Sequence, residues 1–209
     1  MSRLTRTAAA FAVATLAVAG LAGCGTQERL GSAAVIDGHQ ISVDELQTSA
    51  RAYQMVVPGS SPGDVQRAIL EREILSRIIS AAARNVGVHA SAAAVAKARD
   101  GLLASVGGRS GLLRQLAAGQ TPVVLAPSTI DRWFKDQVLY RRIAAKLAVG
   151  GDPTSQDTLA RTTQELIATG RAMEIHVNPR YGTWRTRTGV QPLVSGGLSR
   201  TAAEIRDQG

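Results

Sequence analysis

Apolar residues through the middle of the chain recur every three to four positions, which is the spacing of helices that bury one side. Turn-forming residues interrupt this pattern at residues 58–59, at Gly87 and at residues 150–153. Proline and glycine in such positions end helices. The pattern therefore predicts six helices, at residues 42–57, 61–86, 91–106, 110–118, 128–149 and 155–169.

Serine residues mark several of the predicted helix starts. Ser42 and Glu45 have the S-x-x-E spacing of a capping box, in which the two side chains accept hydrogen bonds from each other's backbone N–H groups. Serine is a preferred cap because its hydroxyl satisfies a free N–H of the first turn. The predicted caps of three later helices are Ser61, Ser91 and Ser128.

The helix predicted at residues 61–86 is polar on only one narrow strip, and apolar residues cover much of the rest of its surface. A helix with this distribution is mostly buried. We therefore expect it to be the central helix of the fold. The strip consists of Gln66, Glu73, Arg77, Ser80 and Arg84.

Strand-like sequence occurs near each end of the helical region. Val35 and Ile36 precede an Asp-Gly turn signal, and residues 172–177 alternate as AMEIHV. Two isolated short strands gain little stability unless they pair with each other. The predicted fold class is therefore mainly α, with a small two-stranded sheet that pairs the N- and C-terminal strands.

The motif NPRYGTW follows the second strand and contains two of the chain's seven aromatic residues. Proline removes a donor from a strand ladder, and glycine permits a turn. We interpret the motif as a clasp that ends the strand pair and packs its aromatic rings on the domain. The alternative is a binding signature. The residues concerned are Asn178, Pro179, Tyr181, Gly182 and Trp184.

The N-terminal region has the pattern of an export signal. Arg3 and Arg6 precede a short apolar run, and the tetrad LAGC, which ends at Cys24, matches the lipobox of bacterial lipoproteins. This resemblance implies cleavage before Cys24, diacylglycerol on its sulfur and anchoring at the extracytoplasmic face of the cell membrane. The alternative is an ordinary secretory signal that ends in cysteine.

These signals divide the chain into four segments. The content of Gly, Ser and Thr near the C-terminus favours a flexible tail. The predicted segments are a lipoprotein signal peptide at 1–23, a lipidated tether at 24–32, a helical domain at 33–184 and the tail at 185–209.

The chain is basic, with 24 Lys and Arg residues against 16 Asp and Glu residues. Removal of residues 1–23 takes away two arginines and no acid, which leaves 22 against 16 and a net charge of +6. On an exported protein this balance fits anionic headgroups or acidic wall polymers, and we expect no nucleic-acid partner. A merely soluble basic surface is the alternative.

Three features together resemble the N-terminal chaperone domain of SurA, trigger factor and the extracytoplasmic parvulin-type foldases. They are AAVIDGHQIS from Ala33, the paired helices that end at Gly87 and the closing VNPRYGTW. With the lipobox, the last motif is similar to a SurA-N-like group of actinobacterial lipoproteins. Related foldases insert a parvulin prolyl-isomerase domain before the last helix, whereas here residues 150–153 form only a short break. The resemblance therefore implies a chaperone cradle without its isomerase.

The sequence offers no pattern of a catalytic or metal centre. The three histidines lack the H-x-x-x-H and H-E-x-x-H spacings of a helical zinc site. Cys24 is assigned to lipid, and acidic residues are scattered singly, so no general acid–base pair suggests itself. We expect no enzyme activity, no metal and no cofactor.

The expected function is chaperone-like binding of unfolded exported polypeptides without ATP. The candidate client-binding residues are Tyr53, Met55 and Val57, because aromatic and flexible apolar side chains adapt to many sequences. Core packing is the alternative for these side chains. A scaffold lipoprotein that binds one specific cell-envelope partner is the competing function. A lipid carrier is disfavoured because it needs a large apolar cavity, whereas alanine-rich helices pack closely.

Overall fold

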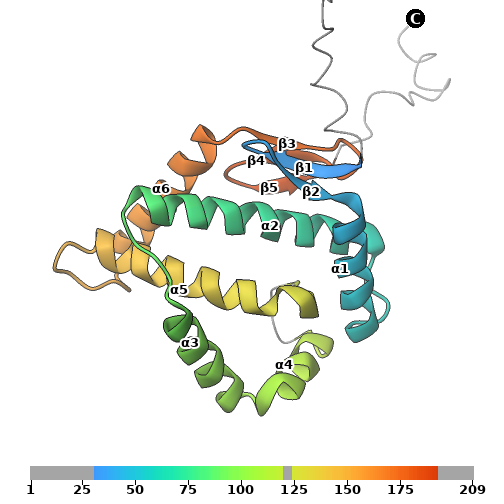
Figure 1. The fold of residues 1–209 in the computed structure, drawn as a ribbon, viewed down its shortest axis with the longest axis horizontal. Helices are drawn as coiled ribbons and strands as arrows, with labels where there is room; N and C mark the ends of the chain where they lie inside the picture. The colour runs from blue at the N-terminus through green and yellow to red at the C-terminus, as the bar shows by residue number, and fades with distance from the viewer. Residues whose placement is uncertain (1–30, 120–123, 193–209) are drawn as a thin grey trace, which may run out of the picture.

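The computed structural model describes residues 31–119 and 124–192 (Figure 1). Cys24 lies outside the described residues, as do the signal segment and residues 193–209 of the predicted tail. The fold is mainly helical with small antiparallel sheets, as predicted. Its elements are β1 (Ser32–Ile36), β2 (His39–Ser42), α1 (Val43–Val56), α2 (Pro62–Asn85), α3 (Ala92–Ser105), α4 (Gly108–Ala117), the 3-10 turn η2 (Pro127–Thr129), α5 (Ile130–Leu147), α6 (Gln156–Ala172), β3 (Ile175–Val177), β4 (Thr183–Arg185) and β5 (Gly189–Gln191).

All six predicted helices are present, with ends that differ from the predicted ones by up to three residues. The capping box forms at the start of α1, where the Ser42 hydroxyl accepts a hydrogen bond from the Glu45 N–H at 3.1 Å. The prediction of Ser128 as a cap is wrong, because η2 precedes α5 and no side chain caps its start. Ser61 precedes α2 but makes no side-chain cap bond.

The N- and C-terminal strands pair as predicted. β1 lies between β2 and β3, and Ala34 is opposite Val177 in the antiparallel β1–β3 ladder. The sheet also contains β2, a third strand that the sequence prediction lacked. Asp37 and Gly38 connect β1 to β2 with φ angles of +48° and +78°. Positive φ at both central residues is the signature of the two-residue turn that suits the twist of a hairpin.

The predicted boundary between domain and tail at residue 185 is wrong. β4 and β5 form a second antiparallel hairpin, in which Trp184 is opposite Val190. Val190 is 5% exposed and belongs to the main core. Gly189 has a φ of +78° and lies against Glu71 of α2. The folded domain therefore extends at least to Gln191.

The helix α2 is the central element, as predicted. It lies between the strands and α5 in Figure 1, and it also contacts α1 and α6. Leu70, Ile74 and Ala82 on α2 are fully buried. The helices α3 and α4 form a V-shaped arm on the far side of α5 (Figure 1). The arm is packed more loosely than α2, since α3 contributes no fully buried side chain.

A buried polar cluster joins α2 to α5. Asp136 of α5 is 2% exposed, and its carboxylate accepts hydrogen bonds from the Ser76 hydroxyl at 3.0 Å and the Arg72 guanidinium at 3.2 Å. Burial raises the pKa of Asp136, against the opposing effects of Ser76 and Arg72. Burial also lowers the pKa of Arg72, against the attraction of Asp136. For both groups, burial affects the pKa more strongly than the charge of the partner does.

Candidate functional site

The motif NPRYGTW begins at the end of β3, where its first residue joins the chain ends. The backbone N–H of Asn178 donates to the carbonyl of Ala33 at 2.9 Å, and its side-chain amide donates to the carbonyl of Ser32 at 3.1 Å. The Asn178 side-chain oxygen accepts from the Arg180 N–H at 3.0 Å. Pro179 follows directly and has no N–H to continue the ladder. Asn178 thus links the C-terminal strand to the first residues of β1.

The two aromatic residues of the motif pack on the domain. Tyr181 is 4% exposed within the main core, and Trp184 is half-buried against it. Gly182 has a φ of +126°, and a Cβ at this position would lie 2.1 Å from the carbonyl oxygen of Gln191, so only glycine fits. This arrangement fits the clasp interpretation better than a binding signature, because the rings are turned into the fold.

The predicted client-binding residues lie in different environments. Tyr53 is 9% exposed and belongs to the main core, so its ring is not available to a client in this conformation. Val57 is half-buried and packs on the same core. Met55 is 79% exposed. Of the three, Met55 alone presents its side chain to a partner.

An open apolar groove lies between α3 and α5, with a volume of about 600 Å³. We call it the α3–α5 groove. Small and aliphatic side chains line it, and cationic side chains stand among them. Sequence analysis missed this surface because its two walls come from helices about 40 residues apart in the chain. Its lining residues are Ala94, Lys97, Ala98, Gly101, Leu102, Ser105, Val138, Arg141 and Arg142.

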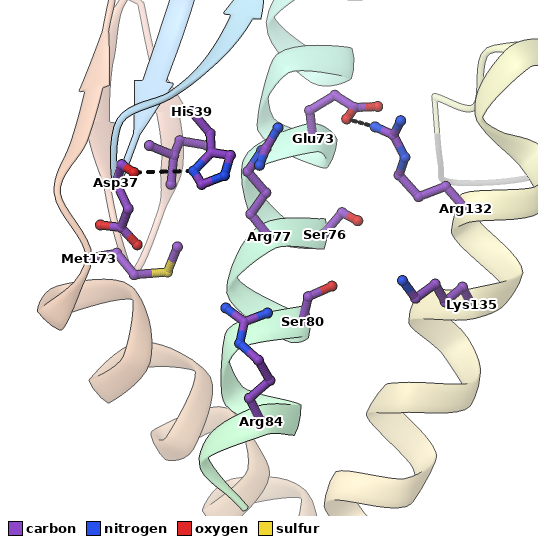
Figure 2. Close-up of a pocket in the computed structure, with 11 residues that line it drawn as sticks. Asp37, His39, Glu73, Ser76, Arg77, Ser80, Arg84, Arg132, Lys135 and Met173 are labelled. Atoms are coloured by element: carbon purple, nitrogen blue, oxygen red, sulfur yellow. Dashed lines mark hydrogen bonds and ion pairs between the residues drawn. The ribbon is translucent and has the colours of Figure 1, made fainter. Parts of the chain in front are cut away.

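A second, polar groove of about 540 Å³ lies over the exposed strip of α2, between the β1–β2 hairpin and α5 (Figure 2). We call it the α2 groove. Most of the polar strip predicted from the sequence lines it, and α5 adds Arg132 and Lys135. Arg132 forms an ion pair with Glu73 of α2, which is drawn as a dashed line in Figure 2. The remaining lining residues are Ile36, Asp37, His39, Ser76, Arg77, Ser80, Arg84 and Met173.

Within residues 31–119 and 124–192, no group of three or more His, Cys, Asp or Glu side chains is placed to hold a metal ion. His39 contacts the carbonyl of Asp37 at 3.1 Å, and His176 contacts the carboxylate of Glu174 at 2.7 Å. None of the helices in the same residues has both the length and the apolar character that a membrane span requires.

The structure is thus a mainly helical domain with small sheets and with an open groove on each side of α5. In comparisons with protein-family models, curated proteins and solved structures, no match to this chain was found. The similarity to the SurA N-terminal domain therefore stays a prediction from the sequence motifs.

Proposed function

We propose that the protein is a lipid-anchored, chaperone-like binding protein that holds unfolded exported polypeptides without ATP and without prolyl isomerase activity. The observation that carries the proposal is the α3–α5 groove. Its open shape and apolar lining suit an extended segment of chain, whereas a small rigid ligand is usually enclosed.

The charge on this groove indicates the kind of segment it binds. Lys97 on α3 and Arg141 on α5 line the groove and make no hydrogen bond or ion pair with any described residue. Leu102 and Val138 line the same groove and offer apolar contact. Electrostatic complementarity therefore favours polypeptide segments that combine apolar and acidic residues.

The exposed side chain of Met55 supports the same function. Methionine is flexible and adapts its shape to different partners. Met55 lies in the last turn of α1, next to Val56, which packs in one cluster with Leu102 and Leu112. The end of α1 thus meets the α3–α4 arm and adds an apolar contact beside it.

The membrane anchor is proposed from the lipobox alone. β1 begins at Ser32, eight residues after Cys24. A stretch of eight residues spans at most about 29 Å, so lipid on Cys24 would hold the domain close to the bilayer. We expect Cys24→Ala to release the protein into the soluble fraction of cells or to leave its signal segment uncleaved. If the variant stays in the membrane fraction with the signal segment correctly removed, the anchor proposal is wrong.

Gly101 offers a matched pair of variants for the α3–α5 groove. It lies on α3, and a Cβ at this position would meet no atom within 4 Å. Gly101→Ala keeps the groove apolar and strengthens the helix by about 1 kcal/mol. Gly101→Glu adds a carboxylate that repels acidic segments. The readout is light scattering of an unfolded acidic client that aggregates in the presence of the purified full chain.

We expect the parent and Gly101→Ala to suppress aggregation at near-stoichiometric ratio, and Gly101→Glu to lose most of this effect. If both variants suppress aggregation equally, the α3–α5 groove is not the surface that binds the client. Isomerisation of a model prolyl peptide should stay at the uncatalysed rate, with times of tens of seconds. Crosslinking in cells that captures one stoichiometric envelope protein, instead of many clients, would favour a scaffold.

A further inference from the structure

The α2 groove contains more positive charge than the fold neutralises. Four cationic side chains line it, namely Arg77, Arg84, Arg132 and Lys135, against two carboxylates. The carboxylate of Glu73 is engaged by Arg132, and that of Asp37 accepts the Glu174 N–H at 2.8 Å. The difference of four cations and two anions leaves a charge of +2 on the groove.

Three of these cations have no partner of their own in residues 31–119 and 124–192. The side chains of Arg77, Arg84 and Lys135 make no hydrogen bond or ion pair there. Arg77 is half-buried, so it is not a freely solvated surface side chain. In Figure 2, Lys135 extends from α5 toward Ser80 on α2. Like charges that line one groove repel each other, and a bound anion would relieve this repulsion.

The hydroxyl groups of the groove point to the same kind of ligand. Ser76 donates its hydroxyl to Asp136 and is already engaged. Ser80 is half-buried, lies one turn further along α2 and makes no hydrogen bond within the described part of the chain. A free hydroxyl among guanidinium and ammonium groups is a typical environment for a phosphate oxygen.

The neighbouring surface limits the length of the anion. A second cavity shares Glu73, Arg77 and Arg132 with the α2 groove, and it is also lined by Asp44 and Glu45 of α1. These carboxylates would repel a polyanion that extended toward α1. The positive region is therefore short and closed at one end by negative charge, which disfavours nucleic acid and long acidic polymers.

We propose that the α2 groove binds a compact phosphate-bearing anion, held by Arg77, Arg84 and Lys135 with Ser80 as an additional donor. The groove volume of about 540 Å³ is in the range of small-ligand sites. The shared chemistry is one or two phosphate groups, which belong either to a soluble phosphorylated compound or to the headgroup of an anionic phospholipid. This inference is independent of the proposed polypeptide binding, which uses the α3–α5 groove.

Isothermal titration of the purified full chain with inorganic pyrophosphate tests the site directly. The groove variant is Arg77→Gln with Lys135→Gln. The control variant is Arg161→Gln with Lys146→Gln, which removes the same charges at exposed positions outside the groove. We expect the groove variant to bind pyrophosphate at least tenfold more weakly than the parent, and the control variant to stay within about twofold of it.

Two further arms identify the source of the phosphate. Cosedimentation of the Cys24→Ala chain, which has no lipid-bearing cysteine, with vesicles of phosphatidylglycerol, compared with phosphatidylcholine, measures binding of a lipid headgroup. Loss of vesicle binding in the groove variant alone assigns the site to a headgroup, and unchanged vesicle binding with weakened pyrophosphate binding assigns it to a soluble compound. If the groove variant does not fold, Arg84→Gln, at an exposed position near the end of α2, replaces it. Absence of phosphate binding by the parent, or equal weakening in both variants, overturns the proposal.

Discussion

Replacing Arg72 with methionine should destabilise the domain strongly at neutral pH. The substitution keeps an unbranched apolar side chain but removes the charge that faces the Asp136 carboxylate at 3.2 Å. At that separation the attraction is about 5 kcal/mol for an effective dielectric constant of about 20. Much of it is offset by the loss of water around both groups. Removal of one partner leaves the other charge buried and alone, which costs about 3–5 kcal/mol.

The lower end of that range applies here because the Arg72 side chain is 16% exposed and keeps some contact with water. We expect Arg72→Met to lower the free energy of unfolding by about 3 kcal/mol at pH 7. This corresponds to a fall in melting temperature of roughly 6–12 °C for a domain of this size. The matched control is Arg99→Met, because Arg99 pairs with Asp100 at 3.0 Å on the surface. Such exposed pairs contribute at most about 1 kcal/mol.

The pH dependence separates this mechanism from a simple packing defect. Burial already raises the pKa of Asp136, and loss of Arg72 removes an effect that opposes the rise. The folded state then binds the proton more tightly than the unfolded state, so stability falls as pH rises from the unfolded pKa, about 3.9, through the raised folded pKa. The loss of unfolding free energy that Arg72→Met causes should therefore be largest near pH 8 and become smaller toward pH 5.

Urea denaturation followed by circular dichroism between pH 5 and pH 8 measures this dependence. A second substitution, Asp136→Asn in the Arg72→Met background, removes the titrating group. The double variant should therefore lose the added pH dependence that the Arg72→Met variant shows. A loss of unfolding free energy below about 1 kcal/mol at pH 7, or a loss that does not change with pH, would contradict the predicted role of the buried ion pair. In either case the charge on Arg72 would not be what opposes the rise in the pKa of Asp136.

Two further predictions concern the C-terminal part of the domain, each measured as a free energy of unfolding. Gly189→Ala should cost about 2 kcal/mol, because φ is +78° and the Glu71 carboxyl group, 2.4 Å from the new Cβ, must move and lose its hydrogen bond from the Val190 backbone N–H. Gly59→Ala, at φ +82° with no atom within 4 Å, should cost only about 1 kcal/mol. Tyr181→Ala should cost about 3 kcal/mol or more. Tyr181→Phe should cost nothing, because the buried hydroxyl has no hydrogen-bond partner among the described residues; a loss above about 1 kcal/mol in the Phe variant would mean that the hydroxyl is bonded.

Local signals in the sequence were sufficient to place the helices. The capping box at Ser42 and the breaks at residues 58–59 and 150–153 each depend on a few adjacent residues, so they can be predicted without tertiary information. The start of α5 was misplaced because proline and the 3-10 turn η2 take up residues 127–129 before the helix begins. A serine in that position looks like a cap in the sequence whether or not it makes the bond.

The hairpin of β4 and β5 was missed although its sequence contains a usable signal. Residues 183–191 read TWRTRTGVQ, which is two short strands joined by three residues and a glycine at positive φ. A connection of three to five residues that contains glycine between two strand-like runs is a hairpin signal. The composition of the segment hid this pattern, because Gly, Ser and Thr also favour disorder. What holds β5 in place is the contact of Val190 and Gly189 with α2, which no local signal reveals.

The polar strip on α2 was found from the sequence, but its significance as one side of a groove was not. A strip of polar residues on a buried helix is read most simply as the side that faces water. The structure adds Arg132 and Lys135 from α5 and His39 from the β1–β2 hairpin, and these segments lie about 40 to 60 residues away in the chain. Helical periodicity describes one element at a time, so it cannot show which charges of different elements converge.

The helix α5 connects the two proposed surfaces, and this gives the buried ion pair a role beyond stability. Arg132 and Lys135, near the start of α5, line the α2 groove, whereas Val138 and Arg141, further along the helix, line the α3–α5 groove. Asp136 lies between these positions, and its carboxylate binds Arg72 and Ser76 of α2. A buried ion pair of this kind adds little net stability, since apolar residues of the same volume would avoid the loss of water. We infer that its contribution is to fix the position of α5 along α2, because a shift of α5 would separate Asp136 from Ser76 and Arg72 and change the width of both grooves together.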